Sequence, residues 1–237
     1  MIGIVAARPE ELAVLLESAE PARGAVSEET VAGRTLLYRT IQGKDVVFAV
    51  SGMGKVAAGA TAAVLAERVS GVILAGTAGG LGIGILPGDV MVADRVRQHD
   101  LDLRPICPRW TVEAQGANSW PCDPGYIAAL EAGVQAALGA GGSAAMCHTG
   151  LLISGDWFVS SPEDGDHLRT LIPDVVGIEV GGASAAQVYY EAGVPCGIVR
   201  TIADRADADA KEDYIRHLET NAGELLASII TTALMWV

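Results

Sequence analysis

Polar side chains stand at the ends of two apolar runs in the last third of this 237-residue chain. The first run, residues 175–180, is β-branched and carries Glu179, and the second, residues 196–202, carries Arg200 and is followed by Asp204. A segment of helical composition joins them, which predicts a strand, helix, strand unit. Open α/β sheets bind ligands at the carboxyl ends of their strands. We therefore expect these side chains to contact a ligand, and a carboxylate there can also give or take a proton.

A further carboxylate that could do chemistry, Glu11, lies near the N-terminus. It follows Arg8, Pro9 and Glu10, directly after an apolar run at residues 1–7 that predicts a strand. Proline in a first helical turn, and carboxylates at the positive end of a helix dipole, are typical of a helix N-terminus. Taken alone, Glu11 is best interpreted as a helix N-terminal acid.

Three glycine-rich stretches could bring the backbone close to a ligand. Residues 51–55, Ser-Gly-Met-Gly-Lys, precede an alanine-rich helix and could hold an anion on backbone N–H groups. They lack the full phosphate-loop pattern, so a tight turn with Lys55 in solvent is the alternative. Residues 76–80, Gly-Thr-Ala-Gly-Gly, follow a buried strand and predict a turn that a ligand can approach. The Gly-Ile-Gly at 82–84 does not open a helix, so no dinucleotide cofactor is predicted.

Two other patterns are open to more than one interpretation. Trp157 and Phe158 follow a predicted strand at residues 147–154, where such a pair can either stack on a flat base or fill the core. His99 and the two aspartates that follow it could suggest a metal site. Without further matching ligands a polar loop is the better interpretation, and no metal is predicted.

Composition excludes several classes of protein. The net charge is −13 and no basic stripe is present, which argues against a nucleic-acid partner. The four cysteines show no ligand or disulfide spacing, which favours reduced thiols and a cytoplasmic location. Two uncharged stretches, residues 69–88 and 132–155, are broken by glycines and are interpreted as buried segments rather than membrane spans. The strand at the N-terminus has no preceding basic region, so no signal peptide is expected.

The elements that must position these residues form one α/β domain over residues 1–237. The pattern predicts a hairpin at 31–50, a helix at 124–138 and a long closing helix at 211–237. Residues 104–123 contain prolines, cysteines and tryptophans without periodicity and are expected to form a long loop, suited to a lid or an interface.

The order of these motifs along nearly the whole chain resembles the nucleoside phosphorylase/nucleosidase superfamily, and within it the 5'-methylthioadenosine/S-adenosylhomocysteine nucleosidases. The resemblance implies an α/β fold with a central mixed, partly closed β-sheet flanked by helices. It also implies a homodimer, a role in methionine salvage, and cleavage of the N-glycosidic bond of a nucleoside by water. The motifs that carry it are Gly3-Ile-Val-Ala-Ala with Glu10-Glu11, Ser51-Gly-Met-Gly-Lys-Val-Ala-Ala, Gly76-Thr-Ala-Gly-Gly-Leu, Pro87-Gly-Asp-Val, His99-Asp, Ile153-Ser-Gly-Asp with Phe158, and Arg200-Thr-Ile-Ala-Asp.

The resemblance also implies roles for individual residues. Asp204 would protonate the leaving adenine as general acid, and Glu11 would activate the attacking water, an arrangement of two carboxylates that glycoside hydrolysis also uses. No metal and no cofactor are needed. The other implied substrate-binding positions are Thr77, Ala78 and Gly79 near the ribose and water, Phe158 stacked on adenine, Val159 reading its edge through the main chain, Glu179 and Val180 at the strand end, and Arg200 behind the site, where it could pair with Glu179.

The sequence departs from the family pattern at three places. The second glutamate after the strand, which grips the ribose hydroxyls, is Gly181 here, and loss of its charged hydrogen bonds should cost roughly 1.5–3 kcal/mol per bond. The serine before the catalytic aspartate is Ala203. Arg8 replaces a methionine, where it could lower the pKa of Glu11 or offer an anion or specificity site.

These departures keep two alternatives to an ordinary nucleosidase. The first is an impaired or altered-substrate homologue, motivated by Gly181. The second is a phosphorylase that uses phosphate in place of water, with Arg8 and the glycine-rich turns as anion binders. Glu11 argues against the second, because a carboxylate repels phosphate.

Overall fold

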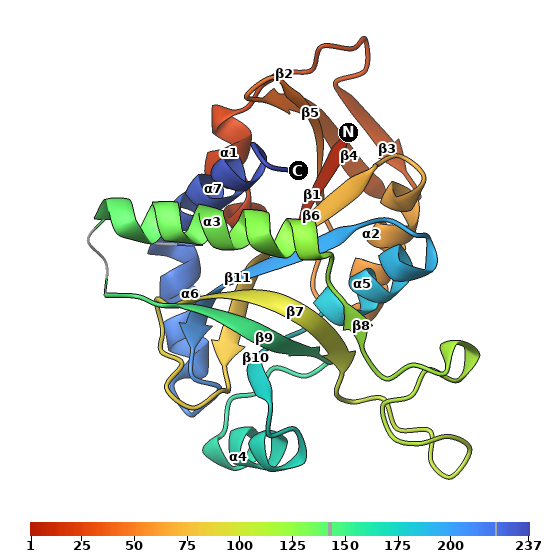
Figure 1. The fold of residues 1–237 in the computed structure, drawn as a ribbon, viewed down its shortest axis with the longest axis vertical. Coiled ribbons are helices and arrows are strands. Elements are labelled where there is room, and N and C mark those ends of the chain that lie inside the picture. Colours follow the sequence, from red (N-terminus) through yellow and green to blue (C-terminus); the bar gives the residue numbers. More distant parts are fainter. Residues whose placement is uncertain (142–143, 221) are drawn as a thin grey trace.

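The computed structural model describes residues 1–141, 144–220 and 222–237, and in this part of the chain eleven strands form one mixed sheet (Figure 1). The path through the sheet is β10-β9-β7-β11-β6-β1-β5-β4-β2, with β3 paired to β4 and β8 to β7. The strands are β1 (Ile2–Ala6), β2 (Glu20–Pro21), β3 (Glu28–Val31), β4 (Arg34–Ile41), β5 (Lys44–Val50), β6 (Gly71–Gly80), β7 (Val90–Gln98), β8 (Trp120–Pro121), β9 (Cys147–Ser154), β10 (Val175–Glu179) and β11 (Cys196–Asp204).

The sheet closes on itself at one end. Besides its parallel neighbour β9, strand β10 pairs antiparallel with β6, with Gly177 opposite Gly80 and Ile178 opposite Gly79. This second pairing links β10, β9, β7, β11 and β6 into a ring, while β1, β5 and β4 continue as an open sheet. The expected central mixed, partly closed sheet is confirmed.

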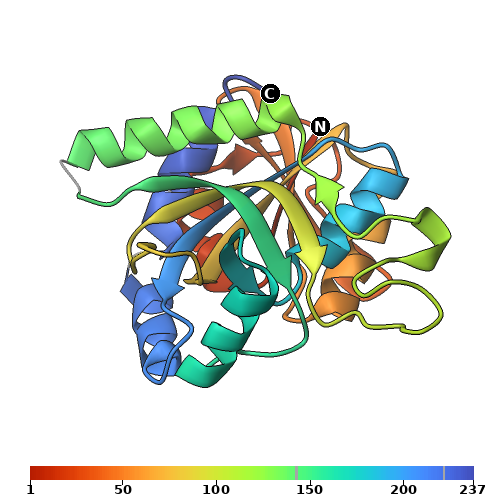
Figure 2. The same cartoon turned by 60° about the horizontal axis from the view of Figure 1, so that its bottom comes forward.

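Helices cover both faces of the sheet (Figures 1 and 2). One group packs its apolar side chains with Ile4, Phe48 and Ile73 in one core, and a second group packs with Val47, Val72 and Ile198 in another. The first group is α1 (Ala13–Ser18), α3 (Pro124–Gly141) and α7 (Ala222–Ala233), and the second is α2 (Lys55–Ala66) and α5 (Gly182–Glu191). The remaining helices are α4 (Pro162–Leu171), α6 (Ala210–Thr220) and the 3-10 helices η1 (Pro9–Glu11) and η2 (Glu113–Gln115).

The loop expected at residues 104–123 is confirmed, with only η2 and the short strand β8 as regular structure. Figure 1 shows it extending away from the sheet beyond the end of β7. Its return to the body is anchored by Trp120, whose side chain is fully buried and donates an indole N–H to Gln115 Oε1 at 2.7 Å.

Two predicted elements differ from the structure. The turn expected at residues 76–80 is wrong, because strand β6 runs through them to Gly80, held by β11 on one side and β10 on the other. The single helix expected over residues 211–237 is described as α6 and α7; residue 221 lies outside the described residues, and α7 ends at Ala233. None of the helices in the described part of the chain combines the length and apolar character that a membrane crossing requires.

Candidate active site

The residues singled out in the sequence meet around one cavity at the strand ends. The cavity, together with the solvent space at its mouth, takes up about 600 Å³. Ten of the predicted residues line it, namely Glu11, Thr77, Ala78, Gly79, Phe158, Val159, Glu179, Val180, Arg200 and Asp204.

Asp204, the last residue of β11, is buried in the cavity wall. Burial raises its pKa to about 6, and the nearby charges of Asp207 and Asp213 act in the same direction. The backbone N–H of Ala206 donates to Asp204 Oδ1 at 2.8 Å, so the main chain orients the carboxyl although Ala203 provides no hydroxyl. A carboxyl with this pKa is protonated in about half of the molecules at pH 6 and can donate that proton.

Glu11 is also buried, and it accepts three hydrogen bonds. The backbone N–H of Arg8 donates to its Oε2 at 2.9 Å, while the backbone N–H and the hydroxyl of Thr77 both donate to its Oε1 at 2.9 Å. Burial raises the pKa of Glu11, and these hydrogen bonds together with the charge of Arg200 oppose the rise. Glu11 therefore does cap the N-terminal turn, as the local sequence predicts, and the same carboxylate faces the cavity.

Two glycines of β6 make room for the two carboxylates. A Cβ on Gly76 would lie 3.0 Å from Glu11 Oε1, and Gly76 also has a positive φ of +153°, a conformation that side chains disfavour. A Cβ on Gly79 would lie 2.7 Å from Asp204 Oδ1, closer than real Cβ contacts allow. The glycines thus allow other groups to come close to the backbone, as expected. These groups include two side chains of the protein itself, Glu11 and Asp204.

Aromatic side chains form another part of the cavity wall. Trp157 and Phe158 line the cavity and are 40% and 38% exposed, so neither fills the core. The ring of Phe158 meets that of Tyr214 edge to face, with centroids 5.8 Å apart. The next residue, Val159, is buried, and among the described residues no hydrogen bond engages its N–H or C=O. Half-exposed aromatic rings therefore lie next in sequence to main-chain groups that make no hydrogen bond among the described residues.

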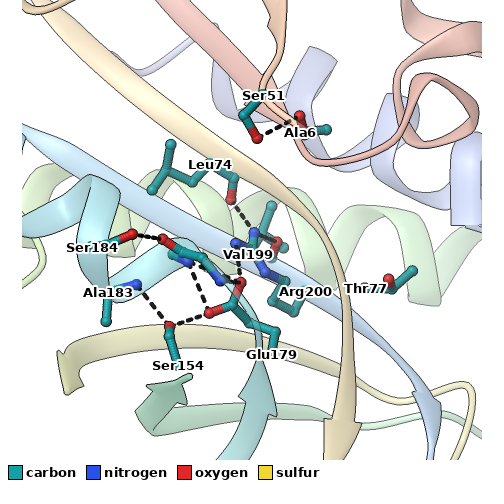
Figure 3. A network of polar contacts seen from close by, with 12 residues as sticks. Ala6, Ser51, Leu74, Thr77, Ser154, Glu179, Ala183, Ser184, Val199 and Arg200 are labelled. Carbon is teal, nitrogen blue, oxygen red and sulfur yellow. Dashed lines mark hydrogen bonds and ion pairs between the residues drawn. The ribbon is translucent and has the colours of Figure 1, made fainter. Parts of the chain in front are cut away.

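Glu179 and Arg200 form a buried network beneath the cavity (Figure 3). Arg200 donates to the carbonyl oxygens of Leu74 and Val199 at 2.7 and 3.0 Å and lies 3.4 Å from Glu179 Oε2, which confirms the expected pairing. The Glu179 carboxylate also accepts the backbone N–H groups of Gly181 and Gly182 and the hydroxyl of Ser154. A carboxylate offers about four acceptor positions, so these donors saturate Glu179.

Gly181 and Arg8 are the predicted site residues that do not line this cavity. Gly181 borders a smaller neighbouring cavity that shares Glu179, Val180 and Arg200 with the first. The Arg8 guanidinium pairs chiefly with Glu10, at 3.1 Å, and its charge interaction with Glu11 is weaker. The net pKa of Glu11 is raised, because burial outweighs the influences that lower it.

The structure adds residues that the sequence did not single out. Tyr214, from α6, and Met53, from the glycine-rich turn before α2, line the cavity, as does Ile178. Met53 lies inside a quoted motif and could have been found there. Tyr214 is one aromatic residue in a polar, amphipathic helix, so no local signal marks it.

In the two polar patterns near the site the charged groups are paired, whereas His99 Nε2 is buried and has no hydrogen-bond partner among the described residues. His99 is buried against Trp157, Asp100 binds Lys55, and Asp102 binds Arg104. In the described ranges no group of three or more His, Cys, Asp or Glu side chains is arranged to hold a metal ion. The alternative with Lys55 in solvent is wrong, because its ammonium group is paired.

Fold and site together define an α/β enzyme architecture with two buried carboxylates at the strand ends. The model of the phosphorylase superfamily matches residues 1–234, and the chain therefore belongs to this superfamily.

Curated relatives make the likeness more specific. A 5'-methylthioadenosine/S-adenosylhomocysteine nucleosidase of Colwellia psychrerythraea is 31% identical over 96% of this chain and 94% of its own length. One of Shewanella denitrificans is 32% identical over 98% of both chains. The resemblance expected from the motifs is confirmed.

Solved structures agree. The nucleosidase of Neisseria meningitidis in complex with methylthio-immucillin-A superimposes with a TM-score of 0.89 at 27% identity, covering 100% of this chain and 99% of the other. A futalosine hydrolase of Helicobacter pylori superimposes with a TM-score of 0.85, also at 27% identity, over 100% and 97% of the two chains.

Proposed function

We propose that this protein is a nucleosidase that hydrolyses the N-glycosidic bond of an adenosine-type, 5'-modified nucleoside and releases adenine. The substrate class is that named for the relatives, methylthioadenosine or adenosylhomocysteine. The observation that carries the proposal is the pair of buried carboxylates, Glu11 and Asp204, in one cavity with the exposed ring of Phe158.

Asp204 acts as the general acid. Its raised pKa keeps a proton available near pH 6, and the proton passes to a ring nitrogen of adenine as the glycosidic bond breaks. Phe158 stacks on the base, and the free N–H and C=O of Val159 pair with its edge. The bonding electrons leave with adenine, and the sugar carbon becomes oxocarbenium-like.

Glu11 in its ionised form acts as the general base. Its carboxylate takes a proton from a water held beside Thr77, and the water oxygen bonds to the sugar carbon. The two carboxylates approach β6 at different positions, Glu11 at Gly76 and Asp204 at Gly79. We propose that a water activated by Glu11 attacks the sugar carbon directly, without a covalent sugar–enzyme intermediate.

Adenine release from methylthioadenosine, followed by absorbance, tests this function. We expect turnover by the natural chain, and a loss of roughly 100- to 10,000-fold in both Glu11→Gln and Asp204→Asn. No release at high enzyme concentration would overturn the proposal.

Gly181 favours a second candidate, a homologue with an altered sugar preference. Gly181 has no side chain to meet the sugar hydroxyls, and the Glu179 carboxylate is saturated by its own protein donors. A site that makes no hydrogen bond to a hydroxyl cannot strongly reject a substrate that lacks it. We therefore expect 2'-deoxyadenosine and adenosine to differ less than about tenfold in kcat/KM.

Restoring a carboxylate at position 181 tests this candidate further. A Cβ there would lie 2.9 Å from the Ala58 Cβ, so Gly181→Glu should be made together with Ala58→Gly, with Gly181→Gln in the same background as the control. We expect Gly181→Glu with Ala58→Gly to raise the preference for the ribose form, and Gly181→Gln with Ala58→Gly not to raise it. An unchanged ratio would show that position 181 does not decide sugar recognition.

A phosphorylase is disfavoured. Its proposed anion binder, Arg8, is paired with Glu10 and does not line the cavity. Independence of base release from phosphate is the expected result.

A homodimer and a cytoplasmic location are further parts of the proposal. Several large apolar side chains are exposed: Val56 is 83% and Ile106 84% exposed, and Met53 and Trp157, which line the cavity, are half-exposed. Surfaces of this kind are typical of protein interfaces. All four cysteines are unpaired thiols, which suits a reducing compartment.

A further inference from the structure

Three polar side chains tie together segments that are far apart in the sequence. They are Lys55 at the start of α2, Asp100 after β7, and Asp156 in the loop of residues 155–161 between β9 and α4. Lys55 Nζ donates to Asp100 Oδ1 at 2.7 Å, and the backbone N–H of Lys55 donates to Asp156 Oδ1 at 2.7 Å. The backbone N–H of Asp156 in turn donates to Asp100 Oδ2 at 3.0 Å. We call this closed set of contacts the latch.

The latch accounts for the glycine-rich turn that the proposed function leaves unused. The turn was a candidate anion site, and the anion next to it is the chain's own Asp156 carboxylate, at the positive end of α2. Gly54 allows this approach, with a φ of +97° and a Cβ position only 3.2 Å from Asp156 Oδ1. Asp100, from the His99-Asp motif, accepts a hydrogen bond from the ammonium group of the same Lys55. The glycine-rich turn and the His99-Asp motif therefore both contribute to the latch.

The latch adjoins, in the sequence, the three residues that form the part of the cavity wall proposed to bind the nucleoside's base. We call these residues, Trp157, Phe158 and Val159, the base wall. Asp156 directly precedes Trp157, Phe158 and Val159. Across the residues that the structure describes, no hydrogen bond engages the main chain of 157–159, so the N–H of Asp156 makes the last main-chain bond before them. Their other restraints are side-chain packing, such as Phe158 against Tyr214.

The electrostatics favour a latch that is closed but not rigid. The side chains of Lys55 and Asp100 are 19% and 29% exposed. Burial raises the pKa of Asp100, but the hydrogen bonds from Lys55 and from the Asp156 N–H outweigh it, and the pKa lies below its ordinary value. Charge pairs with this much exposure contribute modestly, so loss of one member should loosen the loop without unfolding the protein.

We infer that Lys55, Asp100 and Asp156 are positioning residues that hold Phe158 and Val159 in the geometry that binds the base. The inference rests on the proposed function for the identity of that base, adenine. Only molecules with an ordered base wall bind the ligand well. If loss of the latch lowers the fraction of such molecules, the apparent Kd rises by the same factor. It should leave the chemical step at Asp204 and Glu11 nearly unchanged.

The test compares Lys55→Met with Arg68→Met in the full-length protein. Arg68, just beyond the other end of α2, also pairs with a carboxylate of another element, Glu29, at 3.3 Å, and its side chain is 31% exposed. Adenine affinity is measured by calorimetry, and KM and kcat from adenine release. We expect Lys55→Met to raise the adenine Kd and KM by about three- to tenfold, with kcat within about twofold of the natural chain. Arg68→Met should change neither constant, and Lys55→Arg should restore most of the affinity.

A second variant separates the latch from a general loss of charge. Asp100→Asn should weaken adenine binding, and the double variant with Lys55→Met should weaken it by less than the product of the two single effects, because both break the same contact.

Three results would overturn the inference. They are an adenine Kd in Lys55→Met equal to that in Arg68→Met, a fall in kcat at unchanged KM, and failure of the natural chain to bind adenine at millimolar concentration. Should the natural chain bind adenine but release none from nucleosides, the proposed function fails, and the adenine affinities still decide the role of the latch.

Discussion

Asp204 and Glu11 differ in the protonation state that the proposed reaction needs. Asp204 must carry its proton to act as an acid, and Glu11 must have lost its proton to act as a base. Burial raises the pKa of both, to about 6 for Asp204. The pH above which activity falls is therefore set by the pKa of Asp204.

We predict that kcat/KM falls about tenfold per pH unit above pH 6, because the protonated fraction of Asp204 falls in that proportion. Removing a neighbouring negative charge with Asp207→Asn should move this limb to lower pH, since that charge raises the pKa of Asp204. The measurement is kcat/KM for adenine release from pH 5 to 9. A flat profile from pH 6 to 8 would contradict the assignment of Asp204 as the acid.

At the scale of single residues, the sequence predicted the cavity residues that belong to the family's motifs. It did not predict those that reach the cavity only through tertiary packing. Glu11 alone was typical of a helix N-terminal acid, and only the order of motifs pointed to the cavity. Tyr214 lines the cavity because its helix, α6, packs against β11. The main partner of Arg8 is Glu10, a pairing that the sequence analysis did not predict.

At the scale of elements, close contact between helices depends on glycine. In α3, a Cβ on Gly133 would lie 2.4 Å from the carbonyl oxygen of Ile229 in α7, a contact that backbone cannot relieve without moving a helix. Gly139, also in α3, has no neighbour within 4 Å of its Cβ position.

These two glycines give a matched pair of predictions. Gly133→Ala should lower the free energy of unfolding by about 1–3 kcal/mol, because it forces α3 and α7 apart. Gly139→Ala should raise it by up to about 1 kcal/mol, since alanine is the better helix former. Urea unfolding measures both, and equal effects would show that the α3–α7 contact does not limit stability.

Strand β6 shows why element boundaries were harder to predict than element types. The run Gly76-Thr-Ala-Gly-Gly has turn composition, yet it remains a strand because β11 and β10 pair with it from both sides. Its glycines mark the places where Glu11 and Asp204 come close. Long-range pairing, which local composition does not encode, overrode the turn signal.

For the whole molecule, the resemblance predicted the fold class, including the partly closed sheet. The composition alone predicted an α/β domain but not closure, because the β10–β6 contact joins strands about 100 residues apart in the sequence. Closure brings Ile178 and Glu179 to the same cavity as Thr77 and Asp204. The site is therefore a consequence of topology rather than of any one segment.

The most direct measurement of the central claim is adenine release from methylthioadenosine by the natural chain, with Glu11→Gln and Asp204→Asn beside it at the same concentration. The proposal predicts phosphate-independent release of adenine by the natural chain and little or none by either variant, with all three proteins folded. Absence of release by the natural chain, or undiminished release by Asp204→Asn, would contradict it.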